Sequence, residues 1–238
     1  MSTRVASLIP TLTDTLFGEI EEQDVALPSA QDWDLERFAE EQLRFLVGRI
    51  FSPGVPHPAR QVVVTGIERN AGVAGLVMRI AETLTQYSPG VVCVVNAESR
   101  TESEACYGRT AATPSPESSD ALRRSSRQIA DRIWHLPCDV FLGADRPQYG
   151  SRWQERLKRL RREFDYSLVV GPPVERSGQS AFLGNLADGV ILVLRARTTR
   201  KLSAQRAKAM LKSAHARFLG AVLVERTFPI PEKIYRSL

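Results

Sequence analysis

The chain has 238 residues, which suits one α/β domain and leaves little room for two. Its 43% hydrophobic and 25% charged residues are typical of a soluble globular protein, and its short apolar runs exclude a membrane-spanning helix, which needs roughly 20 residues. The net charge of +5 fits an Arg-rich surface, with nucleic acid or an anionic membrane as the alternative partner. Three cysteines without metal-ligand spacing and the lack of a recognisable signal peptide favour the cytoplasm.

The N-terminal part shows a change of pattern near residue 33. Residues 1–32 have little periodicity and predict a flexible N-terminal arm, whereas 33–238 predict a single α/β domain. Residues 33–50 place apolar side chains at helical spacing, and Ser52-Pro53-Gly54 follows as a stop signal. We therefore expect a helical extension ahead of the first strand.

From residue 62 onward, short apolar runs alternate with helical patterns. Helices are predicted around 76–84, 122–133, 153–164 and 202–211, and residues 99–120 are predicted to form a mobile loop. Strands are predicted at 62–65, 91–95, 133–136, 168–170, 190–194 and 221–224. This alternation predicts a doubly wound, mostly parallel sheet of six or seven strands with helices on both faces. Ligands of such sheets bind outside the carboxyl ends of the strands, here residues 66–75, 96–100 and 171–178.

The segment VVVTGIERNAGVAGLVMRI (62–80) predicts a strand, a turn and a helix. In a phosphate-binding loop, G-x-x-x-x-G-K-[ST], the Lys neutralises the phosphates and the hydroxyl binds Mg²⁺. Gly72 occupies the second glycine position, Val73 replaces the Lys, Ala74 replaces the Ser or Thr, and Gly75 follows. A weak anion site at the helix N-terminus is compatible with these changes, and so is a purely structural turn.

Several segments together resemble the cytoplasmic bacterial tyrosine kinases of polysaccharide export (BY-kinases), which belong to the MinD/ParA-like P-loop ATPases. The resemblance covers about residues 36–238. The segments are EEQLRFLVGRI (40–50), VVVTGIERNAGVAG (62–75), VVCVVNAE (91–98), FDYSLVVGPPV (164–174), ADGVILVLRARTT (187–199) and FLGAVLVERTFPIP (218–231). It implies the MinD/ParA-like P-loop NTPase fold.

Set against that family, five positions of the nucleotide site have changed: the Lys, the hydroxyl, both Asp positions and the adenine-side Asn. Asn96 replaces an Asp in the family's V-D-A-D segment, and Glu98 keeps a carboxylate there on a longer side chain. Val170 stands where the metal-associated Asp is expected, and Val224 stands where an Asn reads adenine. We therefore expect ATP and Mg²⁺ binding to be lost or weak, with no catalytic residue and no cofactor.

The family's oligomer motif, E-x-x-R-x-x-R, is only partly present. Glu41 and Arg44 match it, but Val47 replaces the second Arg, so ring assembly is in doubt while a homo-oligomer remains possible. The tyrosine-rich tail is absent, and Tyr235 stands alone. The Arg-rich helix at 156–162 is interpreted as a solvated face, with an acidic partner or anionic lipid as the alternative.

By resemblance, the partner is the cytoplasmic segment of a membrane polysaccharide co-polymerase. The chain would regulate or scaffold capsule or exopolysaccharide export as an inactive kinase relative, at the inner membrane through that partner and without nucleic acid. One alternative is an active but divergent ATP-dependent tyrosine kinase in which Arg69 or Arg79 replaces the Lys. The other is a ParA/MinD-like binder of membrane or nucleic acid.

Overall fold

The computed structural model describes residues 5–9, 35–69, 71–98, 121–142 and 151–226. Within them, eight strands form one sheet in the order β1-β8-β7-β2-β6-β3-β5-β4. The strands are β1 (Val5–Ile9), β2 (Gln61–Gly66), β3 (Val92–Asn96), β4 (Arg127–Ala130), β5 (Ile133–Leu136), β6 (Tyr166–Val170), β7 (Gly189–Arg195) and β8 (Phe218–Arg226). The six inner strands are parallel, and β1 and β4 pair antiparallel at the two edges. The predicted α/β fold with a mostly parallel sheet is confirmed.

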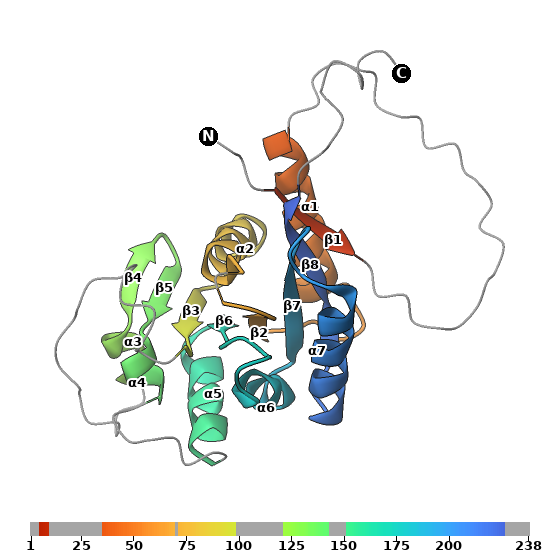
Figure 1. The fold of residues 1–238 in the computed structure, drawn as a ribbon. Helices are drawn as coiled ribbons and strands as arrows, with labels where there is room; N and C mark the ends of the chain where they lie inside the picture. Colours follow the sequence, from red (N-terminus) through yellow and green to blue (C-terminus); the bar gives the residue numbers. More distant parts are fainter. Residues whose placement is uncertain (1–4, 10–34, 70, 99–120, 143–150, 227–238) are drawn as a thin grey trace.

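Helices cover both faces of this sheet, as Figure 1 shows: α1 and α2 lie on one face, and α5, α6 and α7 on the other. The helices are α1 (Leu35–Phe51), α2 (Val73–Tyr87), α3 (Ala121–Ser125), α4 (Cys138–Leu142), α5 (Ser151–Glu163), α6 (Gln179–Leu186) and α7 (Lys201–Ser213). All six residues of β2 are buried, because a central strand covered on both faces has no solvent side. The apolar core is correspondingly split into two clusters, one under α1 and α2 and one under α5, α6 and α7.

Two predictions about local structure are wrong. Residues 5–9, inside the segment expected to be a flexible arm without regular structure, form β1 on the edge of β8. The helix expected through residues 122–133 stops at Ser125, and Arg127–Ala130 forms edge strand β4 instead. Both strands lie at sheet edges, and the side chains of β4 are mostly exposed, so β4 leaves no apolar pattern to recognise. The loop expected at 99–120 lies outside the described residues.

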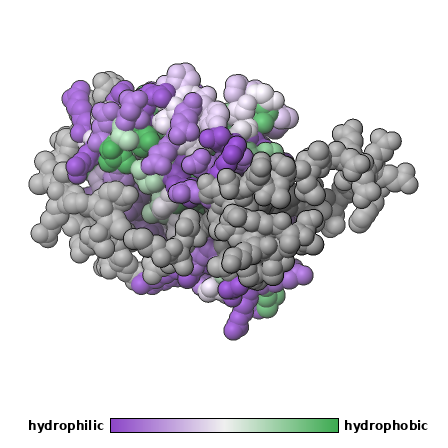
Figure 2. All heavy atoms as spheres, turned by 90° about the horizontal axis from the view of Figure 1, so that it is seen from above, coloured by the Kyte–Doolittle hydropathy of each residue, from purple (hydrophilic) through white to green (hydrophobic). Residues whose placement is uncertain are grey.

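The outer surface is mainly polar. On the face seen in Figure 2, the described side chains are mostly hydrophilic, and the hydrophobic ones form small separate groups. None of the helices in the described ranges has the length and apolar character that crossing a bilayer requires.

One carboxylate joins β2, β7 and α5 at the amino ends of the central strands. Asp188, just before β7, accepts hydrogen bonds from the backbone N–H groups of Arg60 and Gln61, each at 2.8 Å, and from Nη2 of Arg161 at 2.7 Å. Burial raises the pKa of Asp188, but the Arg161 and backbone hydrogen bonds outweigh it and hold the pKa below its usual range. The network therefore fixes the register in which β2 and β7 enter the sheet.

Replacing Asp188 with Asn should lower the free energy of unfolding by about 2 kcal/mol at pH 7, because the charge-assisted network loses its negative charge and one of its two acceptor oxygens. A depressed carboxyl pKa stabilises the fold above the unfolded pKa, about 3.9, and this stabilisation is lost as the pH falls through the folded pKa. The difference in unfolding free energy between the parent and Asp188→Asn should thus shrink below about pH 4, as measured by urea denaturation. Asp131→Asn, whose side chain is 89% exposed, is the matched control and should change little.

Candidate functional site

The loop between β2 and α2 leads from the carboxyl end of a central strand into the N-terminus of a helix. Gly72 is the N-cap of α2 and has a φ of 69°, a left-handed conformation that glycine adopts without strain. Its carbonyl accepts the first helical hydrogen bond, from the N–H of Leu76 at 3.0 Å. The N-terminus of α2 therefore still directs N–H groups out of the carboxyl edge of the sheet.

Val73, the residue in the lysine position, is not fully exposed at the edge of the sheet. Val73 is partly buried and packs against the core cluster under α1 and α2. A Cβ built on Gly66 would lie 3.3 Å from Cγ2 of Val73, so the valine side chain sits close to the end of β2. Ala74 and Gly75, the next two positions, are exposed. Counting back five positions from Gly72 puts Ile67, which is 1% exposed, in place of the motif's first glycine.

Two further substituted positions join the same apolar cluster. Val170, at the end of β6, is 5% exposed, and Val224, in β8, is 8% exposed. Both belong to the core cluster against which Val73 packs. Positions that the sequence analysis treated one by one thus belong to, or pack against, one apolar cluster.

The segment after β6 is tightly packed against α6. A Cβ on Gly171 would lie 2.5 Å from the Ser180 Oγ and 3.2 Å from Cγ1 of Val63, so no larger residue fits while α6 keeps its place. The Ser180 hydroxyl donates to the carbonyl of Pro172, and so does the Thr65 hydroxyl at 2.7 Å. The space that a threonine at position 171 would need is therefore occupied by α6.

Asn96 and Glu98 lie at the carboxyl end of β3. The Asn96 Oδ1 accepts a hydrogen bond from the backbone N–H of Glu98 at 2.8 Å, which ends the strand in a local side-chain turn. Burial raises the pKa of Glu98, and the charges of Arg69 and Arg176 partly offset that rise. Glu98 is thus electrostatically coupled to two exposed arginines, one from the β2–α2 loop and one from the segment after β6.

This cluster changes the role predicted for Arg69. The sequence reading considered Arg69 as a substitute for the missing lysine, and the structure places it close enough to Glu98 for its charge to be partly compensated. Arg176 was not identified beforehand, although it lies within residues 171–178, a segment expected at this edge of the sheet. Its position after a parallel strand was the available signal.

The remaining predicted residues lie elsewhere. Glu41 and Arg44 are exposed on α1 and pair within that helix, Glu41 with Arg37 at 3.8 Å and Arg44 with Glu40 at 3.7 Å. Val47, in the motif's second Arg position, is a core residue at 3% exposure. His135, buried in β5, has a pKa lowered by burial. Across the described ranges, no three His, Cys, Asp or Glu side chains are grouped to hold a metal ion.

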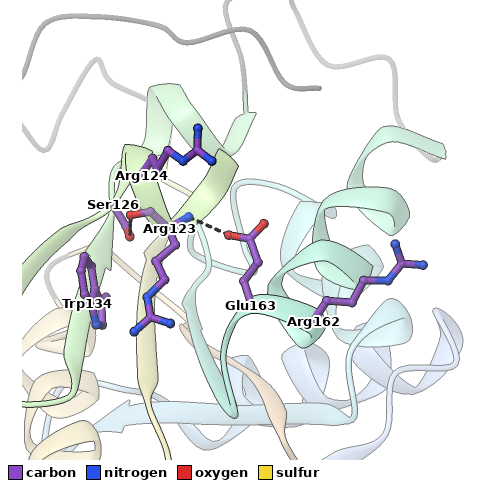
Figure 3. Close-up of a pocket in the computed structure, with 6 residues that line it drawn as sticks. All are labelled: Arg123, Arg124, Ser126, Trp134, Arg162 and Glu163. Carbon is purple, nitrogen blue, oxygen red and sulfur yellow. Dashed lines mark hydrogen bonds between the residues drawn. The ribbon is translucent and has the colours of Figure 1, made fainter. Parts of the chain in front are cut away.

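An open groove of about 520 Å³ lies away from this edge, between α3, β5 and the end of α5 (Figure 3). The Arg123 guanidinium lies over the Trp134 ring, 5.2 Å from its centroid, and the Arg123 backbone N–H donates to Glu163 at 2.7 Å. Glu163 lies between Arg123 and Arg162 in Figure 3, so a carboxylate already offsets part of the positive charge of the groove. The groove opens near the amino ends of the strands and is separate from the β2–α2 loop.

The fold has close counterparts among solved structures. The chimerical protein CapA2B2 matches with a TM-score of 0.59 at 16% identity, over 78% of this chain and 84% of its own. The VpsO kinase domain matches with a TM-score of 0.59 at 17% identity, over 81% and 98%. The kinase domain of Escherichia coli tyrosine kinase ETK matches with a TM-score of 0.54 at 18% identity, over 78% and 74%.

The chain has the fold of the bacterial tyrosine kinase domains. This confirms the fold that the sequence segments predicted. No protein-family model matches the sequence, and a search of curated proteins finds no similar sequence. At these identities the likeness concerns the fold, and the chemistry has to be argued from the chain's own residues.

Restoring the carboxylate at position 170 should destabilise this chain. Val170→Asp buries a carboxylate within an apolar cluster, so we expect a loss of about 3 kcal/mol or more in unfolding free energy at pH 7. Ala74→Asp adds the same charge at an exposed position in the first turn of α2, where the helix dipole favours it, and should be neutral or slightly stabilising. The free energy of unfolding of both variants is measured by urea denaturation. Equal values for the two variants would contradict the placement of Val170 in an apolar environment.

Proposed function

We propose that this chain is a catalytically inactive relative of the bacterial tyrosine kinases that regulates or scaffolds exopolysaccharide or capsule export. The observation that carries the proposal is the single apolar cluster containing Val170 and Val224, with Val73 packed against it. Phosphoryl transfer is mainly positioning and charge neutralisation, and this cluster offers neither charge nor metal ligand.

The remaining polar groups at the edge do not restore that chemistry in this proposal. Glu98 is coupled to Arg69 and Arg176, so the cations near the β2–α2 loop are partly neutralised by a carboxylate within the same protein. An incoming triphosphate would have to compete with Glu98 for both arginines. The N–H groups at the N-terminus of α2 remain, and they support at most weak anion binding.

The role we infer is therefore one of binding. The partner in this proposal is the cytoplasmic segment of a membrane polysaccharide co-polymerase, and the former nucleotide edge is available as a docking surface. Support comes from the kinase-domain fold together with a strand-to-helix turn that has a glycine N-cap but apolar side chains at the next two positions. The rival function, a divergent active kinase, rests on Arg69 or Arg79 as the substitute cation, and the charge of Arg69 is partly offset by Glu98.

The purified chain should show no Mg-ATP binding with a Kd below about 100 μM, which corresponds to about −5.5 kcal/mol. It should also form no phosphotyrosine when incubated alone with ATP. Calorimetry measures the first and mass spectrometry the second. Phosphotyrosine at Tyr235, produced by the chain itself, would favour the divergent-kinase alternative.

The double substitution Val73→Lys with Ala74→Ser should restore some nucleotide binding, because Gly72 and the start of α2 already provide the backbone of the loop. Turnover should remain absent, since Asn96 and Val170 leave the metal and the attacking group unsupported. Nucleotide affinity and phosphate release are measured on the same protein.

Ala74→Ser alone is the matched control, because it adds the hydroxyl without the charge. If the folded double variant binds no more nucleotide than this control, the β2–α2 loop does not have a phosphate-binding geometry. Brisk hydrolysis would instead mean that the lost carboxylates are dispensable and that the proposal of inactivity is wrong.

A further inference from the structure

The positive charge of the chain is concentrated in one stretch. Residues 189–224 contain no Asp or Glu and eight basic residues: Arg195, Arg197, Arg200, Lys201, Arg206, Lys208, Lys212 and Arg217. The whole chain has 32 Lys and Arg against 27 Asp and Glu, so the other residues hold 24 against 27 and are net negative. The basic residues without neighbouring carboxylates in the sequence are thus gathered in 189–224.

Most of this charge lies on or beside α7. Seven of the eight residues, all except Arg195, are exposed. Arg195 is instead paired with Glu225, with Nε and Nη2 at 3.0 and 2.9 Å from the Glu225 Oε2. Ala207 and Leu211 are buried against the sheet and fix the rotation of α7, so its opposite face is held toward solvent.

Two arginines of α5, the helix interpreted from the sequence as a solvated face with docking as the alternative, are used inside the fold. Arg156 donates to the carbonyls of Val140 and Phe141, and Arg161 binds Asp188. The other basic side chains of α5 share the helix with two glutamates, whereas α7 contains no acidic residue. On α7, Lys201, Arg206 and Lys212 have no ion-pair partner among the described residues. Lys208 lies over the Phe218 ring, 5.5 Å from its centroid.

The charges at the N-terminus of α7 also oppose the stability of the helix. Arg200 is the N-cap and makes no side-chain capping hydrogen bond, Lys201 follows, and the first turn has no acidic residue. Cations at a helix N-terminus oppose the helix dipole. A local arrangement that costs stability without a compensating contact is typical of a binding surface.

Two exposed apolar side chains accompany these cations. Leu202 is 55% exposed and Met210 is 44% exposed, and they flank Arg206 at intervals of four residues along one side of α7. A nucleic-acid backbone offers phosphates to the cationic side chains, but it gives Leu202 and Met210 no apolar partner. An anionic bilayer surface offers both phosphate groups and an adjacent acyl region.

We propose that the α7 surface, defined by Lys201, Leu202, Arg206, Met210 and Lys212, docks on an anionic lipid surface. The helix would lie along the headgroups, with the cations at the phosphates and the two apolar side chains reaching below them. The α7 surface is separate from the β2–α2 loop, so the inference does not rest on the loss of nucleotide chemistry.

The test is co-sedimentation of the full chain with vesicles of phosphatidylcholine containing about 30% phosphatidylglycerol, and with pure phosphatidylcholine vesicles, at low and moderate salt. Binding is expected only to the anionic vesicles, and it should weaken as salt rises. Arg206→Gln with Lys212→Gln should weaken it about 30-fold, from about 1 kcal/mol per basic residue at an anionic surface.

The matched control is Lys158→Gln with Arg162→Gln, which removes two exposed charges from α5 and should leave binding within about threefold of the parent. Leu202→Ser with Met210→Ser keeps every charge and should also weaken binding, because the apolar contact is lost. Circular dichroism and thermal melts confirm that each variant folds.

The proposal is overturned if the parent chain does not bind anionic vesicles, binds pure phosphatidylcholine equally, or loses as much affinity in the α5 control as in the α7 variant. It is also overturned in favour of nucleic acid if duplex DNA binds more tightly than the vesicles and only the charge variant weakens that binding. Neither result bears on Mg-ATP binding, so this inference and the proposed function can fail independently.

Discussion

The arrangement of the candidate site depends on how the segment after β6 is held against the loop after β2. The N–H of Gly171 donates to the Val64 carbonyl at 2.9 Å, and the N–H of Val174 donates to the Gly66 carbonyl at 3.0 Å. Thr65 adds a side-chain hydrogen bond to Pro172. Because β2 and β6 are central parallel strands, this contact extends the sheet beyond its regular strands. It brings α6 close to Gly171 and keeps Val170 inside the core.

Sequence reasoning recovered the inner strands and most long helices, since apolar runs and helical spacing report burial directly. It also named Val73, Val170 and Val224 as lost polar positions. It could not show that these valines share one cluster, because they come from α2, β6 and β8 and only the sheet order brings them together. The edge strands β1 and β4 were missed for the opposite reason: edge positions impose little apolar alternation.

The distribution of charge shows a similar limit. Composition gave a net charge of +5, and the obvious Arg-rich segment was α5. In the structure, Arg156 and Arg161 of α5 form hydrogen bonds inside the fold, whereas α7 carries exposed cations and no acidic residue. Whether a basic side chain is available to a partner depends on which carbonyls and carboxylates the fold places near it, and Asp188 lies 27 positions from Arg161 in the chain.

The close approach of α6 at Gly171 limits which substitutions the chain accepts there. A side chain larger than glycine at position 171 would collide with Ser180, and an aspartate at position 170 would place a charge in hydrocarbon. Packing therefore restricts both positions, whatever chemistry a new side chain would bring. A variant with polar side chains at both positions would need compensating changes in α6 and in the apolar cluster before it could fold as stably as the parent.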